Sequence, residues 1–165
     1  MAMRLATLVL ILLASGCGPG APESDTVPPT EDLIRELFSV AWNTGDISGL
    51  DPSASADSIL FHYRGTSSHT TLEDLGGLIS YWHSAFPDLR MELLDLVGNG
   101  DLVAARVRYS GTHLGEWFGI APTGRTVSVD EMMFFRFDDG LLVEAWEVDD
   151  QLSMRIQLGV IDGGP

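Results

Sequence analysis

The feature that most constrains the fold of this 165-residue chain is a change in hydrophobic period at Pro87. Before Pro87, apolar residues recur three and four positions apart, a spacing typical of helices that bury one face. After it, apolar and polar residues alternate, which is typical of strands that bury one face. Helices followed by a run of strands predict an α+β fold in which the helices pack on one face of a sheet.

Capping and turn residues set the limits of these elements. The first helix is expected to begin at Thr30, which can cap it, and to end at Gly45, and the second begins at Thr71 and is closed by Pro87. Strands are expected over residues 58–63, 89–97, 102–113, 126–137 and 141–149, with a final helical turn over residues 154–158. Most of the later strands are joined by short turns, so strands that are neighbours in sequence should pair antiparallel.

Residues 1–16 have the pattern of an export signal. Arg4 precedes an apolar run over residues 5–13, which is too short to remain as a membrane span. A buried N-terminal core helix is the alternative, but the Pro- and Gly-rich stretch that follows would separate such a helix from any core. That stretch, residues 17–30, predicts a flexible tether, and the folded domain is expected over residues 31–161.

Cys17 is the only cysteine of the chain. The preceding Ala14-Ser15-Gly16 resembles a bacterial lipobox, although Leu is more common where Ala14 stands, and ordinary signal cleavage at the same bond is the alternative. We expect Cys17 to be lipidated, and this lipid anchor to be the protein's only link to the membrane. The expected location is therefore the bacterial cell envelope outside the cytoplasm, at the outer membrane or the cell surface. The domain must then fold without a disulfide.

The charge balance excludes some partners. With 24 Asp and Glu against 9 Lys and Arg, the formal net charge is −15, which repels phosphate backbones and argues against nucleic-acid binding. The acids are scattered and not spaced as in a calcium loop, and the four His are too widely separated to indicate a metal site.

Several short phrases occur in a fixed order along residues 31–160. Residues 42–46 read WNTGD, residues 111–116 read GTHLGE, residues 122–125 read PTGR and residues 157–159 read QLG. In this order and spacing they make the chain resemble the SnoaL-like polyketide cyclases, or ester cyclases, of the NTF2-like superfamily. The resemblance implies a cone in which a curved antiparallel sheet is wrapped by the N-terminal helices around a pocket. It also implies a homo-oligomer, such as a homodimer, and no metal or organic cofactor.

The resemblance further implies a catalytic residue. The namesake enzymes close rings by intramolecular aldol condensation, with one pocket Asp as general acid and base. That Asp lies four residues after a Trp, a position that corresponds to Asp150 after Trp146. Many relatives have His directly before this Trp, where the present chain has Ala145.

The residue pattern of the last strand points to the same Asp. Strict alternation places Trp146, Val148 and Asp150 on one face, so we expect Asp150 on the pocket wall, where burial would raise its pKa, and Trp146 against the substrate. A solvated Asp that caps the turn after the strand is the alternative.

Other candidates follow from alternation and from loop position. His113 continues an apolar row and is expected either to donate to an oxyanion at the pocket mouth or to bond a loop carbonyl. His62 is placed to line the same cavity, and Glu131 is a possible second carboxylate in contact with substrate. Trp117 and Phe118 lie in a loop, which suggests a substrate-contacting lid or a subunit contact.

These observations predict a cofactor-independent acid/base enzyme that acts on a small apolar carbonyl or ester compound. Asp150 would carry the proton, and His113 and His62 would polarise the substrate. The alternative is a non-catalytic module at the cell envelope that binds an apolar ligand or dimerises.

Overall fold

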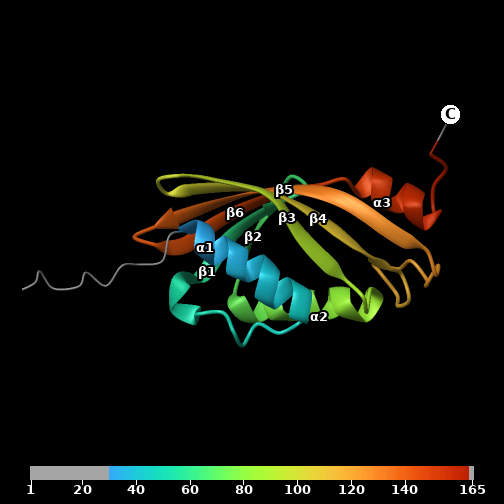
Figure 1. Cartoon of the computed structure of the whole chain (residues 1–165), viewed down its shortest axis with the longest axis horizontal. Helices are drawn as coiled ribbons and strands as arrows, with labels where there is room; N and C mark the ends of the chain where they lie inside the picture. The colour runs from blue at the N-terminus through green and yellow to red at the C-terminus, as the bar shows by residue number, and fades with distance from the viewer. Residues whose placement is uncertain (1–29, 164–165) are drawn as a thin grey trace, which may run out of the picture.

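The computed structural model of the chain describes residues 30–163, so the predicted export signal, Cys17 and nearly all of the tether lie outside the described residues. Six strands form one sheet in the order β2-β1-β6-β5-β4-β3 (Figure 1). The strands are β1 Ser55–Tyr63, β2 Thr66–Thr70, β3 Arg90–Asn99, β4 Leu102–Thr112, β5 Thr126–Asp138 and β6 Leu141–Asp149. The helices are α1 Thr30–Glu36, its π-helical continuation η1 Leu37–Trp42, the short 3₁₀ helix η2 Pro52–Ala54, α2 Leu72–Ala85 and α3 Gln151–Leu158. The predicted α+β class is confirmed.

The two long helical segments lie on the same side of the sheet, where α1 and α2 cover its concave face (Figure 1). A capping box starts α2: the Thr71 hydroxyl accepts from the Asp74 backbone N–H at 3.1 Å, and the Asp74 carboxylate accepts from the Thr71 N–H at 2.9 Å. Asn43, just after η1, bonds both backbone groups of Met91 and so fixes the first helix to the start of β3. No helix within residues 30–163 is both long enough and apolar enough to cross a membrane.

The sheet is mixed, whereas the sequence predicted an antiparallel one. Strands β3, β4, β5 and β6 pair antiparallel with their sequence neighbours, as expected, but β1 pairs with β6 in parallel. Because β1 and β6 are joined through a helix and four other strands, no tight turn forces them to run in opposite directions. Strand β2 was also not predicted, since its sequence TSSHT has no apolar alternation.

A β-bulge near the start of β6 decides which side chains face the helices. Arg136 of β5 pairs with Glu144, but the next residue, Phe137, pairs with Leu142, so Val143 is an extra residue in β6. An extra residue moves all later side chains to the opposite face. Leu142 therefore faces inward before the bulge, and Ala145, Glu147 and Asp149 face inward after it.

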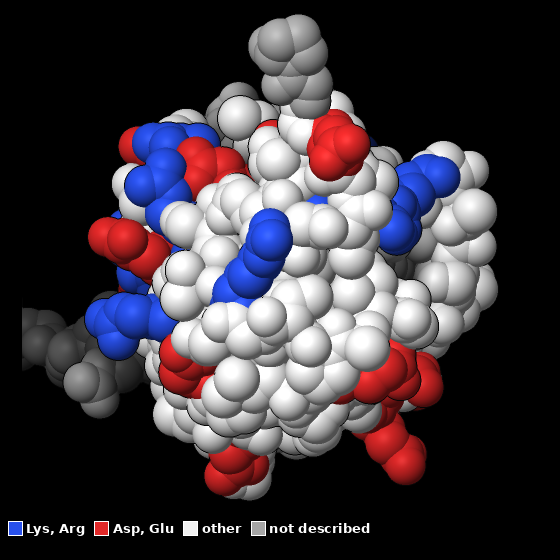
Figure 2. Space-filling view, turned by 90° about the vertical axis from the view of Figure 1, so that its right-hand side faces the viewer, with Lys and Arg blue, Asp and Glu red and all other residues white. Residues whose placement is uncertain are grey.

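Large side chains from the helices and the concave face of the sheet fill the core. Its most buried large members are Ile34, Phe38, Ile79, Phe86, Val103, Val107, Tyr109, Trp117, Phe135, Met154 and Leu158. At the end of the molecule seen in Figure 2, acidic and basic side chains are dispersed over a mostly uncharged surface and form no basic stripe. This face offers no continuous positive surface to a nucleic acid.

Candidate active site

A hollow of about 130 Å³ lies between the helices and the concave face of the sheet. Its walls come from η1, α2 and the inward faces of β1, β5 and β6. The lining residues are Leu37, Trp42, Ile59, Phe61, Thr70, Thr71, Leu75, Leu78, Met133, Phe135, Leu142, Ala145 and Glu147. Glu147 is the one charged residue among them, so the hollow is apolar with a single acid in its wall, as in many ligand sites.

Glu147 belongs to a group of three inward carboxylates on β5 and β6. Glu131 pairs with Asp149 across the two strands, and Glu147 occupies the next inward position of β6. Glu131 is only 7% exposed. Its burial raises its pKa well above the ordinary value, and the charges of Glu147 and Asp149 raise that pKa further. Burial and the neighbouring charges therefore favour the neutral form of the Glu131 carboxyl, which can donate a hydrogen bond.

Glu147 has the proton affinity that acid/base chemistry requires. Burial, followed by the charge of Asp149, raises its pKa to about 7. Near neutral pH the protonated and ionised forms of Glu147 are then both populated, so the carboxyl can accept a proton and return it.

Two tyrosines supply hydroxyl groups beside these acids. Tyr63 of β1 donates to both carboxylate oxygens of Asp149, at 3.1 Å each, and the Gln151 amide also donates to Asp149. Tyr109 of β4 is almost fully buried, and its hydroxyl has no hydrogen-bond partner within residues 30–163. Burial raises the pKa of Tyr109, and the nearby charges of Asp149 and Glu131 raise it further. Tyr109 therefore keeps its proton, and its hydroxyl is a donor beside these acids, although Tyr109 is not among the residues that line the hollow.

Within the part of the chain that the structure describes, no three His, Cys, Asp or Glu side chains form a group that could hold a metal ion. The three inward carboxylates therefore do not converge as a set of metal ligands.

The orientation predicted for Asp150 is wrong. Asp150 follows β6 as the N-cap of α3, where its carboxylate accepts from the Ser153 backbone N–H at 2.9 Å and from the Ser153 hydroxyl at 2.6 Å. Its side chain is exposed, and these hydrogen bonds to Ser153 lower its pKa instead of raising it. The bulge at Val143 is the reason, because it reverses the alternation on which the prediction rested.

Comparison with known proteins identifies the fold family. The sequence model of the SnoaL-like polyketide cyclase family matches residues 32–158. The chain belongs to this family.

Two curated relatives of this SnoaL-like protein carry an enzyme name. The aklanonic acid methyl ester cyclase DauD of Streptomyces sp. (strain C5) is 27% identical over 138 residues, which cover 79% of this chain and 82% of DauD. The aklanonic acid methyl ester cyclase AcmA of Streptomyces galilaeus is 33% identical over 72 residues, which cover 44% of this chain and 50% of AcmA.

Solved structures confirm the NTF2-like architecture. AclR of Streptomyces galilaeus, a proposed hydroxylase, superimposes with a TM-score of 0.70 at 31% identity, over 82% of this chain and 84% of AclR. IdmH of Streptomyces antibioticus, a proposed polyketide cyclase, superimposes with a TM-score of 0.68 at 32% identity, over 79% of this chain and 98% of IdmH.

Two further expected site residues of this SnoaL-like domain face away from the hollow. His62 and Trp146 lie on the outer face of the sheet, where their rings stack with centroids 5.0 Å apart. His62 Nε2 lies 2.8 Å from a Glu144 carboxylate oxygen, and Nδ1 lies 2.8 Å from the Ser67 hydroxyl. The predictions that His62 lines the cavity and that Trp146 contacts substrate there are therefore wrong. His62 alternates with the inward Phe61 and Tyr63, and Trp146 follows the bulge.

His113 is buried, as its apolar row predicted, but it is not among the residues that line this hollow. Its Nδ1 accepts from the Thr123 backbone N–H at 3.3 Å, so the neutral ring carries its proton on Nε2. Its ring stacks on Phe86, and burial lowers its pKa. His113 thus anchors the loop over residues 114–125, as the structural alternative expected, although its ring accepts from a backbone N–H and bonds no loop carbonyl.

Trp117 and Phe118 occupy different environments within that loop. Trp117 is 1% exposed and packs against Trp82 and Phe86, so it belongs to the core and not to a lid. Phe118 is exposed, with its ring against Tyr81 and its backbone N–H donating to the Tyr81 hydroxyl at 2.6 Å. Neither side chain lines the hollow.

Of the predicted residues, only Glu131 lies within the carboxylate group. Glu147, Asp149, Tyr63 and Tyr109 were not singled out from the sequence. The sequence did contain a signal, since Glu147 and Asp149 stand at alternating positions of β6 and therefore share one face. Only the β-bulge shows that this face is the inner one.

Proposed function

We propose that this protein is a cyclase-type acid/base catalyst that acts, without a cofactor, on a small apolar carbonyl or ester compound. The observation that carries the proposal is Glu147, an acid with a pKa of about 7 in the wall of an apolar hollow. The cyclase names of the relatives DauD and AcmA support the reaction class.

The reaction needs a base, a donor to an oxygen and an apolar enclosure. Ionised Glu147 would remove a proton from the carbon beside a carbonyl group, and the Tyr109 hydroxyl or the Glu131 carboxyl would donate to the developing enolate oxygen. The enolate carbon would then attack a second carbonyl of the same molecule and form a carbon–carbon bond. The resulting alkoxide would take back the proton from Glu147, so the product is an isomer of the substrate.

Glu147→Gln is the direct test, with Asp150→Asn as the matched control. We would measure turnover of aklanonic acid methyl ester and the exchange of the α-protons of methyl octyl ketone into deuterated water. Removal of the general base should lower these rates by roughly 10²–10⁴-fold, while the control stays within about threefold. Equal rates for Glu147→Gln and the parent protein would reject Glu147 as the proton carrier.

A readout that needs no substrate completes this test. Carboxyl carbon NMR over a pH series should show a glutamate that titrates near 7 and disappears in Glu147→Gln. Titration of every glutamate near the ordinary value would remove the physical basis of the proposal.

A non-catalytic ligand-binding module is the second candidate, favoured by the almost wholly apolar walls of the hollow. It predicts that methyl octyl ketone binds to the parent protein and to Glu147→Gln alike, without α-proton exchange in either. Exchange by the parent protein alone would decide for the enzyme.

We also propose a homodimer formed through the outer face of the sheet. Met132, Phe134 and Val148 are each more than half exposed there, which is unusual for such side chains. The neighbouring charges are already paired within the chain, Arg136 with Glu144 and Arg108 with Asp130, so a second copy of this acidic protein would not be repelled at this face. Sedimentation velocity should show a dimer that Phe134→Asp dissociates, whereas Phe118→Asp, at the exposed loop residue, leaves it intact. If Phe118→Asp dissociates the dimer and Phe134→Asp does not, the contact between the subunits lies at the loop.

The lipid anchor at Cys17 is a further proposal, supported by the pattern of residues 1–17. Cys17→Ser should move the protein from the membrane fraction to the released fraction. A processed Cys17→Ser protein that still sediments with membranes would contradict the anchor.

A further inference from the structure

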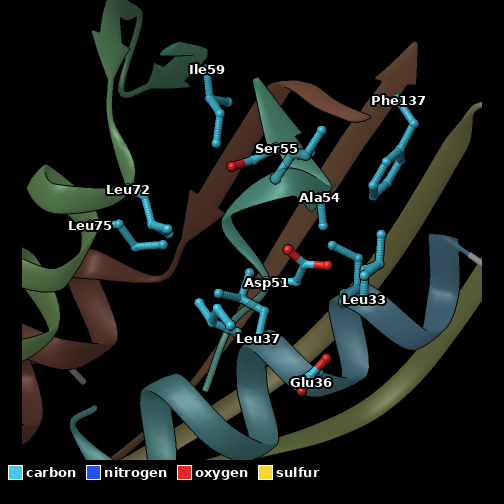
Figure 3. Close-up of a pocket in the computed structure, with 13 residues that line it drawn as sticks. Leu33, Glu36, Leu37, Asp51, Ala54, Ser55, Ile59, Leu72, Leu75 and Phe137 are labelled. Atoms are coloured by element: carbon cyan, nitrogen blue, oxygen red, sulfur yellow. The ribbon is translucent and has the colours of Figure 1, made fainter. Parts of the chain in front are cut away.

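A second hollow, of about 70 Å³, lies beside the first, toward the end of the sheet where β5 turns into β6 (Figure 3). Its walls come from α1, η1, η2, α2 and the sheet, and Leu33, Ala54 and Phe137 lie together at its far end (Figure 3). The two carboxylates among its lining residues belong to Glu36 and Asp51, both exposed residues. Apart from these two acids and Ser55, the lining of this second hollow is aliphatic and aromatic.

The two hollows share four lining residues, and all four are aliphatic: Leu37, Ile59, Leu75 and Leu142. A partition of such side chains can change rotamer without breaking a hydrogen bond. A ligand that displaces part of this partition would lie in one continuous elongated cavity.

The two ends of the elongated cavity differ in the exposure of their acids: Glu36 and Asp51 at the second hollow are exposed, whereas Glu147 at the first is partly buried. Phe137 lines the second hollow and Met133 lines the first, and these residues are four positions apart on β5, or about 13 Å along the strand. Glu147 lines the first hollow only, and Asp149 and Tyr63 lie beyond it on the same inward face. A ligand that spans both hollows would have its hydrogen-bonding group at Glu147 and its apolar end at Leu33.

The charged residues around the first hollow also determine which ligand charge can be bound there. Among the lining residues of both hollows there is no Lys, Arg or His. The charges of Glu147 and Asp149 raise the pKa of Glu131, and the charge of Asp149 raises the pKa of Glu147, so another negative charge there is unfavourable.

From these observations we propose that the two hollows together bind one aliphatic chain that ends in an uncharged oxygen-containing head group, with the chain at Leu33 and the head at Glu147. This inference rests on the proposed function, because it names the substrate class of the same site: long-chain ketones or esters, with straight-chain alcohols as unreactive ligands of the same shape.

Binding of straight-chain alcohols to the full chain, measured by calorimetry, tests the length of the cavity. Decanol should bind at least about tenfold more tightly than hexanol, because its additional methylene groups are buried. Decanoate, which has the same chain length and an anionic head, should bind at least about tenfold more weakly than decanol. Equal affinities for decanol and decanoate would overturn the head-group assignment.

Two variants locate the chain. Ala54→Phe fills the far hollow and should remove the advantage of decanol over hexanol, whereas Ala121→Phe, at an exposed loop residue, should retain it. Leu33→Ala lengthens the cavity and should shift the preference from decanol toward tetradecanol. If both cavity variants keep the parent chain-length preference while circular dichroism shows them folded, the second hollow holds no ligand.

Glu147→Gln separates this inference from the proposed chemistry. Decanol should bind to Glu147→Gln within about threefold of the parent, since an amide can also bond a hydroxyl group. Retained binding with lost α-proton exchange supports both proposals, and retained binding with unchanged exchange rejects the chemistry alone. Loss of the chain-length preference in the parent protein rejects the inference alone.

Discussion

The two faces of β6 hold glutamates with opposite properties, although Glu144 and Glu147 are only three residues apart. On the outer face, His62 and then Arg136 bond the Glu144 carboxylate and lower its pKa. On the inner face, burial raises the pKa of Glu147 to about 7. The same side chain therefore supports the structure on one side of the sheet and is available for proton transfer on the other.

Two pairs of adjacent residues, one aromatic and one acidic, show the same contrast between a buried and an exposed position. Phe135 is 2% exposed in the core, while Phe134 is 52% exposed on the outer face. Asp149 accepts from Tyr63 inside the domain, while the adjacent Asp150 caps α3 in solvent. Position relative to the sheet decides the role of each residue, and six substitutions test that conclusion.

The largest effect is expected from truncation of the inner phenylalanine. Phe135→Ala should lower the free energy of unfolding by about 3–5 kcal/mol, because it leaves a cavity in the core. Phe134→Ala should cost less than about 1 kcal/mol in the monomer. Urea unfolding, monitored by tryptophan fluorescence, measures both. Similar losses of unfolding free energy in the two variants would mean that Phe134 and Phe135 do not differ in burial as described.

A smaller effect on stability, in this case an increase, is expected from Glu147→Gln above neutral pH. Since the folded pKa of about 7 exceeds the ordinary 4.5, this carboxyl stabilises the fold less as the pH rises between these values. Stability of the parent protein should fall between about pH 5 and pH 8, by on the order of 2 kcal/mol for this group. Glu147→Gln cannot ionise, so it should unfold at a higher temperature than the parent at the upper pH.

Glu144→Gln is the control for that experiment. The folded pKa of Glu144 is lowered, so its contribution is lost only as the pH falls below the ordinary range of a carboxyl group. This variant should show the parent's decline in stability from about pH 5 to pH 8. The assignment of the two acids would be reversed if the stability of Glu144→Gln did not change over this pH range, or if the stability of Glu147→Gln declined as the parent's does.

Removal of the α3 cap should have a modest effect. Asp150→Ala leaves the Ser153 backbone N–H without its side-chain acceptor and should lower the melting temperature by a few degrees. Turnover should stay at the parent level, in contrast to Glu147→Gln. A loss of turnover with an unchanged melting temperature would restore Asp150 as a site residue.

The smallest effect is expected at the ion pairs of the outer face. Asp130 accepts from Arg108 at 2.6 Å and from Arg106 at 3.3 Å, all on a solvent-exposed surface. Asp130→Asn should change the melting temperature by no more than about two degrees, and added salt should reduce that difference. Differential scanning fluorimetry with and without salt measures it, and a larger, salt-independent loss would show that these pairs are structurally essential.

Much of the fold could be predicted from the sequence because its signals are local. Apolar spacing, the Thr71 cap and the Gly- and Asp-rich turns each act within a few residues, and they located the two N-terminal helices and the strands β3 to β6. Ordered phrases in the chain were enough to indicate the SnoaL-like family, which the comparison confirms for residues 32–158.

The site was decided by contacts between distant segments. The bulge at Val143 depends on how β6 pairs with β5 at Arg136 and Phe137, and no pattern within β6 alone reveals an extra residue. That one residue turns Glu147 inward, turns Trp146 outward and leaves Asp150 beyond the strand as a helix cap. The parallel pairing of β1 with β6, which places Tyr63 beside Asp149, is likewise a product of assembly. The sequence by itself determined the elements and the family, and only the tertiary structure decided which acids are buried, because burial and charge proximity are properties of the packed sheet.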